Sequence, residues 1–252
     1  MGLDKGNVLE PSCGVGNFIG LMPEKLSGVK MYGVELDSVS GRIAKLLYPE
    51  ATITVNGFEK TEFPDGFFDV AVGNVPFGGY KLADRRYDRQ NFFVHDYFIA
   101  KAIDKVRPGG VIAFITSNGI SGGTMDKQDR KAREYIAQRC DLLGAVRLPN
   151  NAFRANAGTK INADILFLQK LEAPRILEKE LPEWVQTDRI FDQDYTNDKG
   201  EINHNFITVN RYFQEHPEMV LGEQEIVSGP YGPQLVCKPL EGADLGEQLK
   251  EA

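Results

Sequence analysis

The sequence has few residues that could cross-link the chain or hold a metal. Its 252 residues contain only three cysteines, without a Cys-x-x-Cys pair. This usage predicts neither a disulfide framework nor a zinc site and suits a reducing compartment, so we expect a cytoplasmic protein. The three histidines are too scattered in sequence to indicate a metal cluster.

Long apolar runs are also missing. No run reaches the roughly 18 residues that a membrane span needs. The N-terminal segment MGLDKGNVLEP has neither the basic region nor the apolar stretch of a signal peptide. The sequence therefore predicts no association with a membrane.

Positive charge is scarce overall and unevenly spread. The net charge is −7, with a balance of +3 over residues 1–170 and −10 over residues 171–252. Neutralising phosphates requires clustered lysine and arginine, so a protein this acidic is a poor non-specific binder of nucleic acid. If DNA is the substrate, residues 1–170 must contact it, and part of the binding affinity must come from regions outside this segment.

Short apolar runs alternate with helical patterns along the first two thirds of the chain. The predicted strands cover residues 7–11, 29–36, 51–57, 68–75, 110–118, 142–149 and 163–171. The predicted helices cover residues 38–47, 91–106 and 126–140. This alternation is typical of an α/β, doubly wound, mostly parallel sheet. We expect a core over residues 1–172 and an acidic, partly irregular extension over 173–252, with a polar loop at 192–205.

The first motif is EPSCGVGNF, Glu10 to Phe18, at the end of the first predicted strand. Gly14 and Gly16 let the backbone turn sharply and approach a ligand closely. Doubly wound folds bind nucleotides at this position, but the dinucleotide fingerprint needs a third glycine where Ile19 stands. Taken alone, the motif also fits a tight turn without a ligand.

The second motif is GVELD, residues 33–37, which ends the second predicted strand. An acid at this position can accept hydrogen bonds from both hydroxyls of a ribose, and Glu35 is placed for that role. The feature does not separate NAD from S-adenosylmethionine. A solvated acid at a strand end is the alternative.

The third motif is NVPFGGY, Asn74 to Tyr80, after the fourth predicted strand. The lone pair of an adenine amino group is delocalised into the ring. The Asn74 side-chain oxygen and the next backbone carbonyl can accept both N–H bonds and favour a pyramidal nitrogen. Pro76 stiffens the turn, and Phe77 offers a ring face to an extruded base. An Asn-Pro turn with a core phenylalanine is the competing interpretation.

Together these motifs resemble the γ-type N6-adenine DNA methyltransferases, in which the cofactor motif precedes an Asn-Pro-Pro-aromatic catalytic motif. The resemblance implies the fold of class I S-adenosylmethionine-dependent methyltransferases, a seven-stranded sheet with 163–171 antiparallel beside 142–149. It implies a catalytic role for Asn74, Val75, Pro76 and Phe77. Valine replaces the first proline of the motif but retains the backbone carbonyl that this position contributes.

The same resemblance implies that S-adenosylmethionine is the cofactor. The residues assigned to its site are Glu10, Pro11, Gly14, Gly16, Phe18, Glu35, Phe58 and Glu59. The family places an acidic-aromatic pair after the third strand to hold the cofactor adenine. Phe58 matches the aromatic residue, Gly57 stands where the acid is usual, and Glu59 is the candidate substitute.

Two further segments resemble the methylase part of large methylase–helicase proteins of phages, plasmids and conjugative elements. In LPNNAFRANAGTKINADILFLQK, residues 148–170, Phe153 is the candidate for packing on the flipped base, although a core phenylalanine fits as well. Residues 207–240 resemble the segment that follows the methylase core. The resemblance implies a piece of a larger mobile-element protein related to restriction-modification, whose helicase or target-recognition regions are candidate partners. We expect that the isolated piece can lack activity.

Between the third motif and the next helix, residues 78–90 place basic side chains among aromatic ones. Lys81, Arg85 and Arg86 stand near Tyr80 and Tyr87 and are candidate contacts to DNA. A solvated loop diluted by acids is the alternative.

The preferred hypothesis is an enzyme that methylates adenine in DNA. One alternative is methylation of a protein glutamine or another planar amine. Another is a non-catalytic cofactor-binding or scaffold module.

Overall fold

The computed structural model describes residues 3–118, 123–154, 160–196, 202–229 and 232–252. The chain divides into two compact units that interleave along the sequence. Unit 1 comprises residues 1–116, 135–144 and 166–176, and unit 2 comprises residues 117–134, 145–165 and 177–252. This is a division by packing, so the predicted functional boundary at residue 172 stays a prediction.

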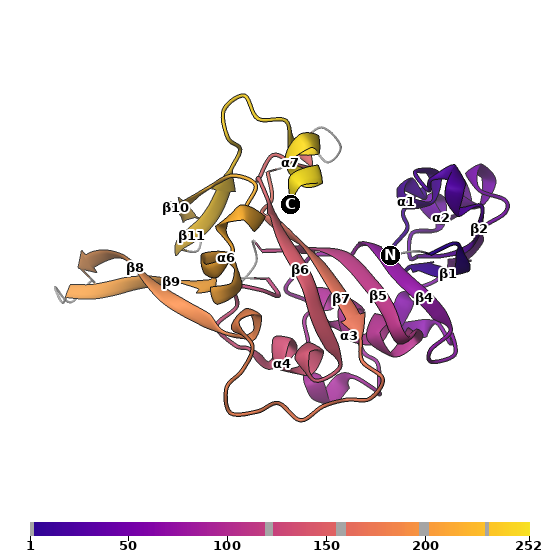
Figure 1. Ribbon diagram of the computed structural model, residues 1–252, viewed down its shortest axis with the longest axis horizontal. Helices are drawn as coiled ribbons and strands as arrows, with labels where there is room; N and C mark the ends of the chain where they lie inside the picture. Colours follow the sequence, from indigo (N-terminus) through magenta and orange to yellow (C-terminus); the bar gives the residue numbers. More distant parts are fainter. Residues whose placement is uncertain (1–2, 119–122, 155–159, 197–201, 230–231) are drawn as a thin grey trace. The chain divides into compact units, whose positions relative to one another are not determined.

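A central seven-stranded sheet has the order β3-β2-β1-β4-β5-β7-β6 (Figure 1). Its strands are β1 (Lys5–Glu10), β2 (Gly28–Glu35), β3 (Thr52–Val55), β4 (Phe68–Asn74), β5 (Val106–Ser117), β6 (Cys140–Leu148) and β7 (Ala163–Lys170). The pairs β1–β2, β1–β4, β2–β3 and β4–β5 are parallel. This arrangement confirms the predicted α/β fold with a mostly parallel seven-stranded sheet.

The seventh strand runs against its neighbour, as the family resemblance implies. The Leu171 N–H, just after β7, donates to the Arg139 carbonyl, just before β6, over 2.8 Å. At the other ends of these strands, the Ile161 N–H donates to the Asn150 carbonyl over 3.0 Å. The end of β7 therefore lies beside the start of β6, which makes the pair antiparallel.

The helices of the sheet region are α1 (Asn17–Gly20), α2 (Ser38–Leu47), α3 (Val94–Lys105) and α4 (Lys131–Ala137). The Asp37 side chain caps α2 by accepting a 2.7 Å hydrogen bond from the Ser40 N–H. The helix predicted from residue 91 begins three residues later, because Asn91 adopts a left-handed conformation with φ 58°. The helix predicted over 126–140 is restricted to α4.

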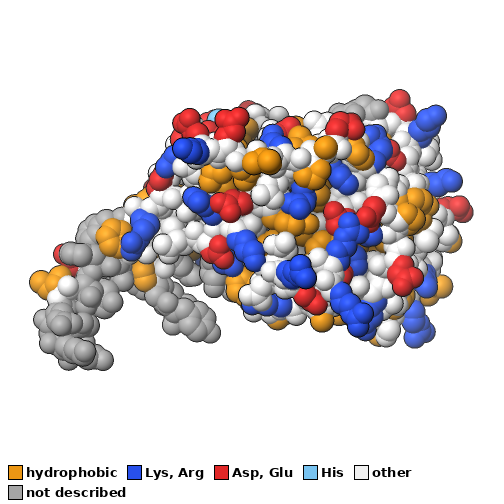
Figure 2. Space-filling model, turned by 90° about the horizontal axis from the view of Figure 1, so that it is seen from below, with side chains coloured by type: hydrophobic (Ala, Val, Ile, Leu, Met, Phe, Trp, Pro, Cys, Tyr) orange, Lys and Arg blue, Asp and Glu red, His pale blue; other side chains and the backbone are white. Residues whose placement is uncertain are grey.

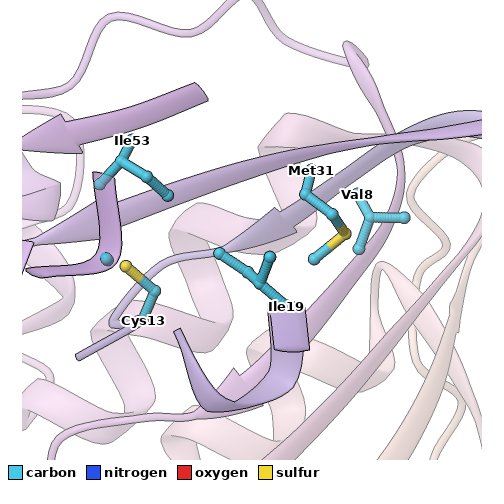
Figure 3. Packing of buried hydrophobic residues seen from close by; sticks show 6 residues of the cluster. Val8, Cys13, Ile19, Met31 and Ile53 are labelled. Atoms are coloured by element: carbon cyan, nitrogen blue, oxygen red, sulfur yellow. The ribbon is translucent and has the colours of Figure 1, made fainter. Parts of the chain in front are cut away.

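Buried residues of β1, β2 and β3 pack with the loop after β1, with α1 and with α2. Figure 3 shows the side chains of this cluster, which comprises Val8, Cys13, Ile19, Met31, Ala44 and Ile53. Gly33 lies against two members of this cluster, Ile53 and Cys13. A Cβ built on Gly33 would lie 2.7 Å from Ile53 Cδ1 and 2.8 Å from Cys13 Sγ. A side chain there would push the loop after β1 away from the sheet, so this glycine positions the loop.

Unit 2 contains two antiparallel ribbons, β8 (Thr187–Thr196) with β9 (Ile202–Asn210) and β10 (Glu223–Gly229) with β11 (Gly232–Lys238) (Figure 1). The short helices α6 (Arg211–Glu215) and α7 (Leu245–Glu251) complete it. The expected polar loop at 192–205 is wrong where the structure describes it, because its ends extend β8 and β9. Residues 197–201 lie outside the described residues. The side chains of this segment show no apolar alternation in the sequence, so only the backbone pairing identifies these strand ends.

A buried ion network joins the elements of unit 2. The Arg147 guanidinium is 1% exposed and contacts Asp164 at 2.9 Å and Asp126 at 3.0 Å. Arg147 also donates to the Gln224 side chain at 3.1 Å, and its guanidinium carbon lies 4.0 Å from the centre of the Phe213 ring. The acidic C-terminal segment therefore supplies partners to a buried charge.

Candidate active site at the carboxyl edge of the sheet

Three predicted motifs meet where β2, β1 and β4 end. These strands are neighbours in the sheet and run in the same direction. Their carboxyl ends therefore share one edge, the usual place for ligands in open α/β sheets. The loops after Glu10, Glu35 and Asn74 all begin there.

The glycines of the first loop have different roles. Gly14 has φ 55° and Gly16 has φ 89°, both in the left-handed region that favours glycine. A Cβ on Gly16 would lie 2.5 Å from the Tyr48 ring, so this position is also closed sterically. A Cβ on Gly14 would meet no described atom within 4 Å. The space beside Gly14 is thus open, whereas Gly16 packs inward.

Glu35 holds this loop against the end of β2. Its two carboxylate oxygens accept the Gly14 N–H over 2.8 Å and the Asp37 N–H over 2.7 Å. Hydrogen bonds to a charged acceptor are stronger than neutral ones. A carboxylate has about four lone-pair positions, so Glu35 retains acceptor capacity for hydroxyl groups.

Glu10 and Pro11, at the start of the loop, are both buried. Burial, reinforced by the nearby charge of Glu35, raises the pKa of Glu10 to about 8. Phe18 lies on α1 and is half-buried. Glu10 and Pro11 thus anchor the start of the loop after β1 in the protein interior.

The loop after β4 is joined directly to the first loop. The Ser12 hydroxyl donates a 2.8 Å hydrogen bond to the backbone carbonyl of Asn74. Val75 is buried, and its N–H donates to the Ile115 carbonyl on β5 over 3.2 Å. The Asn74 side chain is exposed, while Pro76 and Phe77 are half-buried. The structure thus restrains the peptide group between Asn74 and Val75 through both its carbonyl and its N–H, and it leaves the Asn74 side-chain amide accessible.

Ser12 is a residue that sequence reasoning missed. It lies inside the quoted EPSCGVGNF motif, but its partner is 62 residues away. The only available signal is that two loops following adjacent parallel strands must lie close together, and this does not specify the hydroxyl.

Phe58 lies in the core instead of on an open surface. It is 2% exposed and packs with Phe98 at a ring-centre distance of 5.1 Å, with the Lys101 ammonium 5.1 Å from the ring centre. Its ring faces are therefore covered in this structure, and an adenine cannot stack on them without rearrangement. The prediction that Phe58 stacks on the adenine finds no support in this packing.

Glu59 takes up the space that an acidic side chain at position 57 would enter. A Cβ built on Gly57 would overlap the Glu59 carboxylate. Both residues lie in the segment after β3. Although Gly57 lacks the acid that the family pattern places there, a carboxylate two residues later occupies the same place.

The structure disperses the basic side chains of the loop after the third motif. Arg86 is ion-paired with Asp65 at 2.8 Å and Asp104 at 2.9 Å. Asp65 precedes β4 and Asp104 precedes β5, so Arg86 lies at the amino edge of the sheet, opposite Asn74. This position gives no support to the prediction that Arg86 contacts DNA beside the third motif. The sequence does not reveal this position, because the segment that precedes α3 passes the last turn of that helix, where Asp104 lies, before the helix begins.

The remaining basic residues differ in their surroundings. Lys81 is exposed and donates a 2.7 Å hydrogen bond to the Asn91 side chain. Arg85 is also exposed. Figure 2 shows one face of the molecule, on which basic side chains are mixed with acidic and apolar ones instead of forming a continuous basic stripe. This distribution agrees with the small positive balance of the first 170 residues.

Phe153 is half-buried in a turn after β6 and belongs to unit 2. Its assignment to the flipped base stays a prediction. Residues 155–159 of the same segment lie outside the described residues.

Comparisons with known proteins agree with this geometry. The family model described as N-6 DNA Methylase matches residues 3–205. This chain belongs to the N-6 DNA methylase family. It is therefore built on the core of an S-adenosylmethionine-dependent methyltransferase.

Two curated relatives come from viruses. The chain is 37% identical over 174 residues to Defense against restriction protein B of Escherichia phage P1, covering 67% of this chain and 7% of that protein. It is 31% identical over 131 residues to Modification methylase CviBIII of Paramecium bursaria Chlorella virus NC1A, covering 50% of this chain and 34% of that protein. The chain thus spans a small part of the length of either relative.

Solved structures agree with the fold. A class I S-adenosylmethionine-dependent methyltransferase from Listeria monocytogenes matches with a TM-score of 0.54 and 22% identity, over 71% of this chain and 57% of that one. The M protein of the type I restriction enzyme EcoKI matches with a TM-score of 0.50 and 18% identity, over 66% and 40%. No helix of the described residues is long and apolar enough to cross a membrane.

The residues at the carboxyl edge fit this cofactor. The open space beside Gly14 admits a ligand against the loop backbone. Glu35 supplies an ordered acceptor next to that backbone. These two features make the loop after β1 a candidate site for the methyl donor.

Proposed function

We propose that this chain methylates the exocyclic amino group of adenine in DNA, with S-adenosylmethionine as methyl donor. The observation that carries the proposal is the hydrogen bond from Ser12 to the Asn74 carbonyl. It joins the loop suited to the methyl donor with the loop suited to the amino group. Holding two reactants in the correct geometry is the main contribution that a protein makes to such a transfer.

Asn74 acts on the acceptor. Its side-chain oxygen, together with the Val75 carbonyl, accepts the two N–H bonds of the adenine amino group and so localises the nitrogen lone pair. The bound cofactor supplies an electrophilic methyl group on a sulfonium sulfur. The exposed Asn74 amide is accessible to an incoming base, whereas the Ser12 and Ile115 contacts restrain the backbone beside it. Phe77 packs against the extruded base.

DNA is polyanionic, so positively charged side chains must attract it to this edge of the sheet. Lys81 and Arg85 are the candidate phosphate contacts in unit 1, because Arg86 is engaged elsewhere. A net charge of −7 supplies little non-specific affinity. We therefore assign much of the DNA affinity to helicase or target-recognition regions of a longer protein. The small share of each viral relative that the chain covers supports this assignment.

Two competing functions make different predictions. An Asn-Pro-aromatic loop also suits methylation of a glutamine amide in a protein. A non-catalytic module would bind cofactor or DNA without transferring the methyl group. The membership of the N-6 DNA methylase family favours DNA.

The test uses the full-length protein with methyl-labelled cofactor and mixed-sequence DNA, followed by digestion to nucleosides. Label in N6-methyladenine is expected. A parallel reaction contains a glutamine-bearing peptide without DNA. Label only in the peptide would replace the substrate assignment, and cofactor binding without transfer to either substrate would favour the non-catalytic module.

A further inference from the structure

Glu10 is a buried carboxyl group whose hydrogen bonding is incomplete. The residue is 2% exposed and ends β1 at the candidate site. Its Oε2 atom is buried and has no hydrogen-bond partner among the described residues. Burying a charged oxygen without a partner is costly, so such an atom requires an explanation.

Among the described residues, the groups around Glu10 come from three elements and supply no compensating cation. On β2, the Glu35 carboxylate adds a like charge, and in the loop after β1 the buried Cys13 thiol lies nearby. On β4, a Cβ built on Gly73 would lie 3.4 Å from Glu10 Cγ, so backbone packs there. Burial and Glu35 together raise the pKa of Glu10 to about 8.

This environment favours a neutral acid in the free protein and an ionised acid beside a cation. A nearby positive charge favours the carboxylate, whereas burial favours the carboxylic acid. The methyl donor carries a sulfonium charge, and its demethylated product is a neutral thioether. The two ligands of one site thus differ by one unit of positive charge next to an acid that is close to titrating.

We propose that Glu10 releases a proton when the sulfonium cofactor binds and regains one when the neutral product forms, so that it favours cofactor over product. The inference rests on the proposed function, because it requires the methyl donor at the Gly14–Glu35 loop. The proton passes to solvent on binding and returns from solvent after transfer. Glu10 is therefore a residue that sets ligand preference through charge.

The first test is calorimetric titration of the full-length protein at pH 7 in two buffers with different ionisation enthalpies. S-adenosylmethionine is expected to release up to about one proton per molecule bound, and S-adenosylhomocysteine distinctly less. In Glu10→Gln the release should disappear, and the ratio of cofactor to product affinity should fall roughly tenfold, the equivalent of one pKa unit. Glu24→Gln, a change of an exposed acid on another segment, should match the wild type.

The outcomes separate the two proposals. Cofactor binding without proton release, or equal release by Glu10→Gln, would overturn the role of Glu10 and leave the proposed function standing. Proton release without methylation of DNA would do the reverse. No cofactor binding would overturn both.

A second measurement does not depend on the variant. Carboxyl carbon resonances of the free wild-type protein, labelled at glutamate, should include one that titrates well above the others. Complete titration of every glutamate near its usual range would also overturn the inference.

Discussion

The Ser12 hydroxyl donates a 2.8 Å hydrogen bond to the Asn74 carbonyl, although 62 residues separate the two in sequence. Ser12 belongs to the loop after β1 and Asn74 ends β4, and these strands are neighbours in the sheet. The bond fixes the position of the loop after β1 relative to the loop after β4. Donor and acceptor sites of a methyl transfer need this kind of alignment.

Ser12→Ala tests that alignment. Because Ser12 is half-buried, loss of one neutral hydrogen bond should lower the free energy of unfolding by only about 1 kcal/mol. The transfer rate should fall more than stability does, since the Asn74 backbone loses one of its restraints. Single-turnover rates and thermal unfolding of the same preparation check this. An unchanged rate would show that the bond is only structural.

The sequence predicted the strands of the sheet well because each is a compact apolar run between turn signals. The sequence also located the three motif loops, because each one directly follows a predicted strand. It could not reveal that Phe58 is covered by Phe98, or that Arg86 lies at the far edge of the sheet, because both depend on packing between distant segments. Nor did it indicate β8, whose strand residues are too polar to show a buried face.

Arg85 and Arg86 are adjacent, but their substitutions should differ. Arg86→Ala breaks partly exposed ion pairs with Asp65 and Asp104, a loss of about 1 kcal/mol of stability or less, and should leave DNA affinity unchanged. Arg85→Ala should weaken DNA binding and reduce the slope of its salt dependence by about one. Binding isotherms at several salt concentrations distinguish them. Equal weakening by both would place the Arg86 side chain on DNA.

Arg147 should be essential to unit 2. Arg147→Ala leaves the Asp126 and Asp164 carboxylates without their shared cation, and breaking a buried pair costs about 3–5 kcal/mol. Chemical denaturation measures the loss. The matched control Arg139→Ala changes an arginine that packs 3.7 Å from the Tyr135 ring centre without a buried ion pair, so it should cost less. Equal losses in the free energy of unfolding for the two variants would show that the buried ion pairs of Arg147 add no stability beyond that of an ordinary arginine contact.

Glu10 gives the free protein a specific pH dependence. Its pKa is about 8 when folded and 4.5 in the unfolded reference, so the folded state binds more protons between these values. The free energy of unfolding should therefore fall as pH rises from about 4.5 to 8, by up to about 1.4 kcal/mol for each unit of pH. Glu10→Gln should flatten this part of the profile. A wild-type profile that rises across the same range, with no difference from Glu10→Gln, would contradict the assignment.

The most direct test of the central claim compares two variants in the full-length protein. Asn74→Ala should abolish formation of N6-methyladenine yet leave cofactor affinity nearly unchanged, because its contacts strengthen in the transition state. Glu35→Ala should instead weaken cofactor binding, since charge-assisted hydrogen bonds of about 1.5–3 kcal/mol each are lost. Methylation of adenine by Asn74→Ala at the wild-type rate would contradict the account.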